Sequence, residues 1–160
     1  FGRLDGILHH AGQLGRIMPF EQYNPELWEQ VMQVNINGPI WMTQALLPLL
    51  KSSRDASVIF TSSGVGRKGR AYWGAYAVSK FATEGFVEVL AEELEHLGSI
   101  RVNSLNPGAT RTQMRRTAYP GEDPAALRTA EEIMPTYLWL MGPESRGHNG
   151  EKFDAQPPKA

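Results

Sequence analysis

The stretch SVIFTSSGVGRKGRAYWGAYAVSKFATEGFVEVLAEELEH, from Ser57 to His96, decides the fold. Its first five residues, SVIFT, are mostly β-branched or aromatic, so they predict a buried strand. A glycine-rich loop follows, from Gly64 to Gly74. From Gly74 to about His96 the apolar residues recur at helical spacing, and Gly98 predicts the end of that helix. The stretch is therefore a strand, a loop and a long helix.

The same alternation continues on both sides of this stretch. Further strands are predicted at Leu4–His9, Ile100–Leu105 and Lys152–Ala155. Helices are predicted from Asn24 to Leu50, with a kink or a division at Pro39, and from about Glu131 to Met141, after a polar loop over Ala109–Arg128. Strands that alternate with long helices predict one α/β domain built on a doubly wound parallel sheet.

Three polar, glycine-rich segments follow the first three predicted strands. They are Gly12–Gly15, Ser62–Gly74 and Asn106–Thr112. Ligands of open parallel sheets bind beyond the carboxyl ends of the strands. We therefore expect the functional site where these three segments meet.

The composition narrows the class of protein. The 160 residues include 16 Lys and Arg against 17 Asp and Glu, a formal net charge of −1, which argues against a broad nucleic-acid or anionic-membrane surface. The absence of cysteine excludes disulfides, thiolate catalysis and cysteine-ligated zinc within this sequence. No apolar run approaches the roughly 20 residues of a membrane span. We expect a cytoplasmic protein with no nucleic-acid, membrane or metal partner.

Tyr76 and Lys80 are four residues apart at the start of the predicted helix, so they share one helix face. An ammonium group beside a phenol favours the phenolate and lowers its pKa, which makes tyrosine a usable general acid/base. Ser63 ends the preceding strand and could place its hydroxyl beside the phenol. A core tyrosine with a solvated lysine, and a serine that only satisfies backbone groups, stay open as alternatives for these residues alone.

The order T-S-S, twelve residues, then Y-A-V-S-K resembles the catalytic set of the short-chain dehydrogenase/reductase family. Three further segments resemble family motifs in the family's order: the turn His9-His10-Ala11-Gly12, the pair Val34-Asn35, and Asn106-Pro107-Gly108 with Thr110 and Thr112. The stretches GRAYWGAYAVSKFATEG, IMPTYLWLMG and FDAQP are most similar to the YciK type of bacterial oxidoreductases. Two departures stand out: His10 replaces the usual asparagine, and FDAQ replaces Asp-Gly-Gly.

The resemblance implies a Rossmann-like fold and an oxidoreductase that uses NAD or NADP to interconvert a carbonyl and an alcohol. Tyr76 would be the general acid/base and Ser63 would hold the substrate oxygen. Lys80 would bind the nicotinamide ribose and lower the pKa of Tyr76, and Asn35 would anchor a water that leads to Lys80. The cofactor-binding residues implied are Ala11, Gly12, Tyr76, Lys80, Pro107, Gly108, Thr110 and Thr112.

The family also implies a small-molecule substrate and a homo-oligomer, a dimer or tetramer, built on the helices at Asn24–Leu50 and Gly74–Leu97. Two other functions stay open: an isomerase or lyase of the same fold, and a catalytically silent binding or regulatory module. Gly64–Gly69 matches G-x-G-x-x-G, but no strand with a terminal acid follows it, so we do not interpret it as a dinucleotide motif. Arg67, Lys68 and Arg70 in that loop are expected to be solvated, with phosphate binding as the alternative.

The motifs begin at the family's fourth strand. We therefore expect residues 1–160 to be the C-terminal catalytic part of a short-chain dehydrogenase, with the N-terminal nucleotide-binding segment outside this sequence. If the 160 residues were the whole molecule, we would expect weak cofactor binding and an exposed sheet edge at Leu4–His9.

Overall fold

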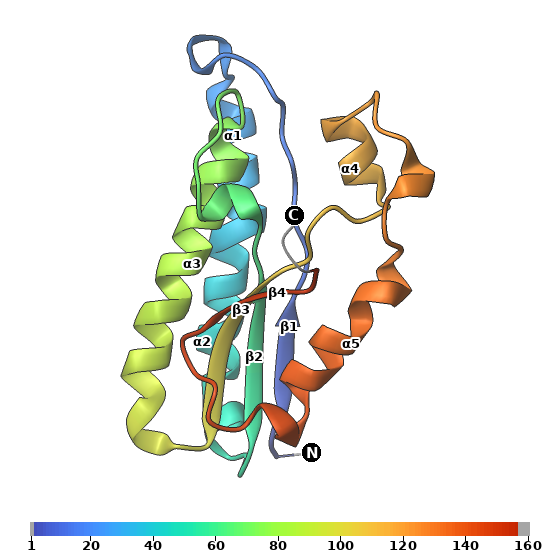
Figure 1. The fold of residues 1–160 in the computed structure, drawn as a ribbon. Helices are drawn as coiled ribbons and strands as arrows, with labels where there is room; N and C mark the ends of the chain where they lie inside the picture. Colours follow the sequence, from blue (N-terminus) through green and yellow to red (C-terminus); the bar gives the residue numbers. More distant parts are fainter. Residues whose placement is uncertain (1, 157–160) are drawn as a thin grey trace.

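Four parallel strands form one sheet in the order β1-β2-β3-β4 (Figure 1). The computed structural model describes residues 2–156. The strands are β1 (Gly6–His9), β2 (Ala56–Thr61), β3 (Ile100–Asn106) and β4 (Lys152–Asp154). All four predicted strands and the parallel sheet are confirmed, and their ends differ from the prediction by two residues or fewer. Within the described residues β1 is an edge strand, because it pairs with β2 alone.

Five α-helices accompany the sheet among the described residues: α1 (Pro25–Met32), α2 (Gly38–Lys51), α3 (Gly74–Leu94), α4 (Gln113–Ala118) and α5 (Ala130–Met141). Local sequence sets their ends. The Asn24 side chain caps α1 by accepting a bond from Leu27 N at 3.1 Å. Thr129 and Glu132 form a capping box at the start of α5. None of the described helices is long and apolar enough to cross a membrane.

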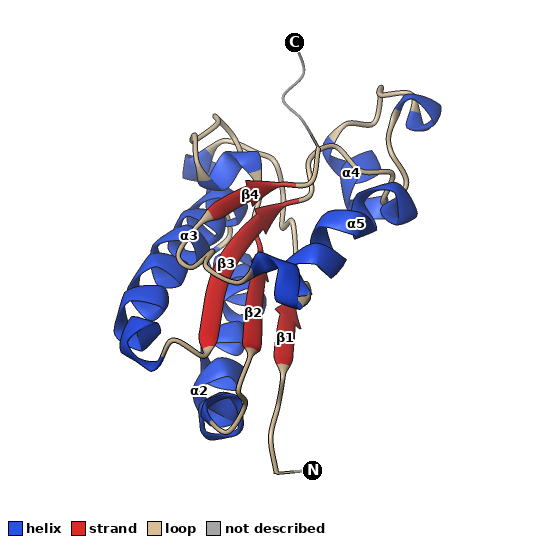
Figure 2. Ribbon diagram, turned by 60° about the horizontal axis from the view of Figure 1, so that its bottom comes forward, coloured by secondary structure: helices blue, strands red, loops and turns tan. Residues whose placement is uncertain are grey.

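The helices lie on both faces of the sheet (Figure 2). Buried apolar residues of α2 and α3 pack against one face; Leu50 and Val87 meet Val58 and Val102 there. On the opposite face, α5 packs its buried residues against Ile59 and Leu105. Because β2 and β3 are covered on both faces, they are buried almost without interruption, including polar residues such as Ser57, Arg101 and Asn103.

A π-helical segment, Gln33–Asn37, joins α1 to α2. The sequence predicted an interruption of the helix here, and the structure confirms it. Pro39 closely follows the π turn, and because proline has no N–H it cannot donate to a carbonyl of that turn. The extra residue of the π turn widens the helix at Asn35, as is common at functional sites.

The segment predicted as a polar loop, 109–128, contains the short helix α4. That prediction was wrong because α4 is held by its cap and by pairing within the segment. Thr112 accepts a bond from Arg115 N at 3.1 Å, and the Arg115 guanidinium donates to Glu122 at 2.6 and 2.7 Å. Figure 1 shows that α4 lies above the sheet, beyond the carboxyl ends of its strands.

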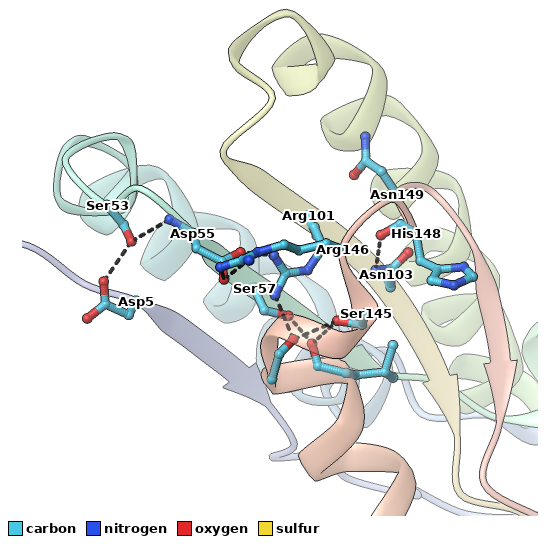
Figure 3. A network of polar contacts seen from close by, with 12 residues as sticks. Asp5, Ser53, Asp55, Ser57, Arg101, Asn103, Ser145, Arg146, His148 and Asn149 are labelled. Atoms are coloured by element: carbon cyan, nitrogen blue, oxygen red, sulfur yellow. Dashed lines mark hydrogen bonds and ion pairs between the residues drawn. The ribbon is translucent and has the colours of Figure 1, made fainter.

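The amino ends of β2 and β3 carry a polar network (Figure 3). Asp55 accepts hydrogen bonds from the guanidinium groups of Arg101 and Arg146, the latter at 2.8 Å. Ser57 donates to the carbonyl of Leu140 at 2.7 Å and thereby joins β2 to α5. Bonds from Arg146 and Arg101 hold the pKa of Asp55 below its usual value, against the effect of burial. The polar network at this end of the sheet therefore stabilises the fold.

Candidate active site

A cavity of about 460 Å³ opens at the carboxyl ends of the strands, below α4. The predicted site segments meet there, as expected for a parallel sheet. Eight of the predicted site residues line the cavity: Gly12, Ser63, Tyr76, Lys80, Pro107, Gly108, Thr110 and Thr112. Ala11 and Asn35 are not among its lining residues. Among the described residues, no group of three or more His, Asp or Glu is placed to hold a metal ion.

Tyr76 is buried at the start of α3, between Leu14, Trp73 and Ala77. Burial raises the pKa of Tyr76 above its usual 10, and the neighbouring Ser63 side chain, which lowers this pKa, opposes that effect only in part. That Lys80 lowers this pKa stays a prediction. The Lys80 ammonium lies 5.7 Å from the centroid of the ring and donates its hydrogen bond elsewhere.

Lys80 is 4% exposed and donates to the carbonyl oxygen of Thr61 at 2.7 Å. Burial lowers its pKa from 10.5 to about 8, although the nearby carboxylate of Glu84 raises it. The ammonium is therefore largely protonated at neutral pH. Only one of its three protons has a partner among the described residues, so two remain for a molecule in the cavity.

Asn35 lies behind the cavity and fastens the loop after β1 to α3. Its Oδ1 accepts from Gln13 N at 2.7 Å, and its Nδ2 donates to Gln13 O and to Ser79 Oγ, both at 2.9 Å. A Cβ built on Gly12 would be 3.7 Å from Asn35 Oδ1 and 3.9 Å from Lys80 Nζ. Asn35 thus positions the loop beside Lys80; its suggested role in anchoring a water stays a prediction.

The Pro107-Gly108 turn is shaped by Gln156, one of the departures from the family pattern. Gln156 Nε2 donates to the carbonyls of Pro107 at 2.8 Å and Ala109 at 3.0 Å. Gly108 has φ of +72°, a conformation that favours glycine. Thr112 lines the cavity while its hydroxyl oxygen caps α4, so its hydroxyl proton is still available to a ligand.

Arg67 is a positioning residue that sequence reasoning missed. It is paired and only 25% exposed, rather than freely solvated as expected: its guanidinium donates to Glu84 at 3.2 Å, to Asp154 at 2.8 Å and to the carbonyl of Phe153 at 2.8 Å. The neighbouring Gly66 packs so closely that a Cβ there would be 2.8 Å from Lys80 Cβ. The loop after Ser63 is therefore clamped onto α3. No local signal reveals this, because the partners of Arg67 are 17 and 87 residues away.

One wall of the cavity is apolar and aromatic. Trp73 contacts both Tyr76 and Tyr119, with ring centroids 5.8 and 5.9 Å apart, and Leu14 and Met114 join the same cluster. The wall faces a polar side that carries Ser63, Tyr76 and Lys80. This arrangement can hold a molecule with an apolar body and a polar oxygen, and can exchange a proton with that oxygen.

Comparison with known proteins agrees with this site. The profile of the short chain dehydrogenase family matches residues 1–123. The uncharacterized oxidoreductase YciK of Escherichia coli K12 is 58% identical over 157 residues, which cover 98% of this chain and 62% of that protein. The crystal structure of YciK superposes with a TM-score of 0.94.

Two other solved structures carry a cofactor. A short chain dehydrogenase from Escherichia coli CFT073 complexed with NADPH, and one from Shigella flexneri complexed with NADP, are each 57% identical. Each has a TM-score of 0.94 and matches 98% of this chain and 65% of its own. The chain thus spans less than two thirds of the length of these relatives. The family profile, the sequence identity and the shared fold together place the chain in the short chain dehydrogenase family.

Proposed function

We propose that the protein is an NADP-dependent oxidoreductase that interconverts a carbonyl and an alcohol, with Tyr76 as the general acid/base. The observation that carries the proposal is that Ser63, Tyr76 and Lys80 line one cavity, with Ser63 close enough to Tyr76 to lower the pKa of its phenol. NADP is favoured over NAD because the solved relatives at 57% identity hold NADPH or NADP.

The cavity fits such a cofactor on its own chemistry. Lys80 has two free protons for ribose hydroxyl groups, and Gly12 and Gly108 leave room for close approach. Ser62 Oγ is buried at the cavity without a hydrogen-bond partner among the described residues. We assign cofactor contacts to Ala11, Gly12, Tyr76, Lys80, Pro107, Gly108, Thr110 and Thr112. The bound cofactor would supply or accept the hydride.

The proton would move between Tyr76 Oη and the substrate oxygen while Ser63 Oγ holds that oxygen. Because burial keeps the pKa of Tyr76 above 10, the phenol is protonated at neutral pH. Tyr76 is therefore prepared to donate a proton, which suits reduction of a carbonyl. The aromatic wall of Trp73 and Tyr119 supports a small-molecule substrate with an apolar body.

The test replaces Tyr76 by Phe in the whole protein and follows NADPH oxidation with a panel of apolar ketones and aldehydes. General acid/base catalysis contributes about 10²–10⁴-fold, so we expect Y76F to lose at least about 100-fold in turnover while still binding NADPH. Retained turnover in Y76F would contradict the mechanism. A product formed without net cofactor oxidation would instead indicate an isomerase or lyase.

We also propose that the protein is a homo-oligomer. Large apolar side chains are exposed on α2 and α3: Trp41, Met42, Leu49, Val78, Phe81 and Val89. A second copy that presents the same face would bury them. Light scattering on the whole protein tests this, and a monomeric mass would contradict it. A cytoplasmic location, and a nucleotide-binding segment outside residues 1–160, stay predictions.

A further inference from the structure

His9 and His10 are adjacent at the end of β1 but meet different surroundings. His9 is buried, forms a hydrogen bond with Thr43 Oγ1 at 2.8 Å and stacks on Phe60 at 4.5 Å. His10 lines the cavity instead. Successive side chains of an extended segment point to opposite faces, so the two imidazoles serve different parts of the molecule.

The contacts of His10 leave one ring nitrogen available. Nδ1 forms a hydrogen bond with Thr61 Oγ1 at 3.0 Å, and the ring meets the edge of Tyr137 at 6.0 Å between centroids. Nε2 has no hydrogen-bond partner among the residues that the structure describes. Because Thr61 belongs to β2, this bond joins His10 to the neighbouring strand.

Thr61 places His10 next to the proposed cofactor-binding lysine. The Thr61 side chain contacts His10, while the Thr61 carbonyl accepts from Lys80. Burial, and secondarily the Lys80 charge, lower the pKa of His10 below 6.5. The other charged or titratable groups at the cavity are Tyr76 on α3, Arg115 on α4, Tyr119 directly after α4 and Tyr137 on α5. No carboxylate is among the lining residues, so nothing there neutralises a second cation.

We propose that His10 is a ligand-binding residue of the cavity: its Nε2 bonds the nicotinamide dinucleotide held by Lys80, and its protonated form strengthens that binding. The inference rests on the proposed function and extends it, because it assigns a cofactor contact to a residue where the chain departs from its family. At neutral pH the imidazole is uncharged and offers one hydrogen bond. At lower pH it becomes a second cation beside Lys80, which favours an anionic dinucleotide.

The experiment follows the histidine ring signals of the whole protein by NMR between pH 5 and 8, with and without NADPH. His10→Asn assigns the His10 signal and restores the family residue. We expect NADPH to raise the titration midpoint of His10 by about half a unit to one unit, which by linkage is about threefold to tenfold tighter binding. His9→Asn is the matched control and keeps this response, because His9 does not line the cavity. The ring signals of the wild type keep the test valid if either variant folds poorly.

Each outcome decides a different statement. A His10 midpoint that NADPH leaves unmoved would overturn the inference while the proposed function stands. The same conclusion would follow if H10N bound NADPH with the affinity and pH dependence of the wild type. If the wild type bound no NADPH at any pH, the proposed function would fail and the inference with it.

Discussion

At the amino ends of β2 and β3, Asp55 accepts hydrogen bonds from two arginines, whereas at the carboxyl ends Lys80 has one carbonyl partner and faces a cavity. Both regions bury charge, and buried charge is costly unless it is paired. The amino-end network offsets most of that cost by pairing within the chain, although Arg101 Nε has no hydrogen-bond partner among the described residues. At the cavity, two protons of Lys80 and the Ser62 hydroxyl have no partner among those residues. The two regions therefore differ in where their unpartnered polar groups lie, because those of the candidate active site line a cavity that a ligand can enter.

The variant with the largest expected effect on activity is Lys80→Met. The apolar replacement removes the cavity's ammonium, so we expect activity of the whole protein to fall by about 10²–10³-fold, the range typical of a lost electrostatic contact. Stability should be unchanged or higher, because no charge is buried any longer. Steady-state kinetics and chemical denaturation measure the two quantities. Lys68→Met, at an exposed position in the adjacent loop, is the control; equal losses in both variants would contradict the assignment.

Asp55→Ala should lower the stability of the protein and leave its activity almost unchanged, the reverse of Lys80→Met. It leaves Arg101, whose side chain is 8% exposed, without its carboxylate, so we expect a loss of about 2–3 kcal/mol in the free energy of unfolding. Activity of the folded protein should stay within about twofold. The exposed pair of Glu88 and Lys152 supplies the control, since Glu88→Ala should hardly change the denaturation midpoint. Lost activity without lost stability would assign Asp55 to the site.

Arg67→Ala tests whether the contacts that hold the Ser63 loop against α3 contribute to catalysis or only to the fold. The variant frees this loop from α3 and β4, and we expect kcat to fall by about tenfold because misplaced catalytic groups lose rate steeply. KM should change less, and Arg67→Lys should restore only part of kcat because lysine cannot form the forked contact. An unchanged kcat in the folded R67A variant would show that the clamp is only structural.

The smallest expected effect is on pH dependence. Burial lowers the pKa of Lys80 to about 8, so the ammonium is present below that pH and is lost as pH rises through it. We expect NADPH affinity to weaken severalfold between pH 7 and 9. Isothermal titration in K80M, which carries no titrating group there, should show no such decline. A decline of equal size in K80M would assign the titration to another group.

Much of the fold was predictable because its signals are local. The β2 run and the α3 periodicity are written in consecutive residues, and Ser63, Tyr76 and Lys80 sit on that one strand–loop–helix unit. The clamp of Arg67 and the pairing of Asp55 with Arg146 were not predictable, because their partners are 87 and 91 residues away. The raised pKa of Tyr76 depends on burial by several segments, which the spacing between Tyr76 and Lys80 does not reveal.

Two serines at opposite ends of β2 allow the most direct test of the account. Ser57 lies near the start of the strand and Ser63 follows its end, and each is replaced by alanine. Ser63 lines the cavity beside Tyr76, and Ser57 donates to Leu140 O in the opposite network. For Ser63→Ala we predict about a 100-fold loss in kcat/KM with an unfolding free energy within about 1 kcal/mol of the wild type. For Ser57→Ala we predict a loss of about 1 kcal/mol in stability, with kcat/KM within about twofold. A fully active S63A variant, or an S57A variant that is stable but inactive, would contradict the assignment of chemistry to the carboxyl ends of the strands.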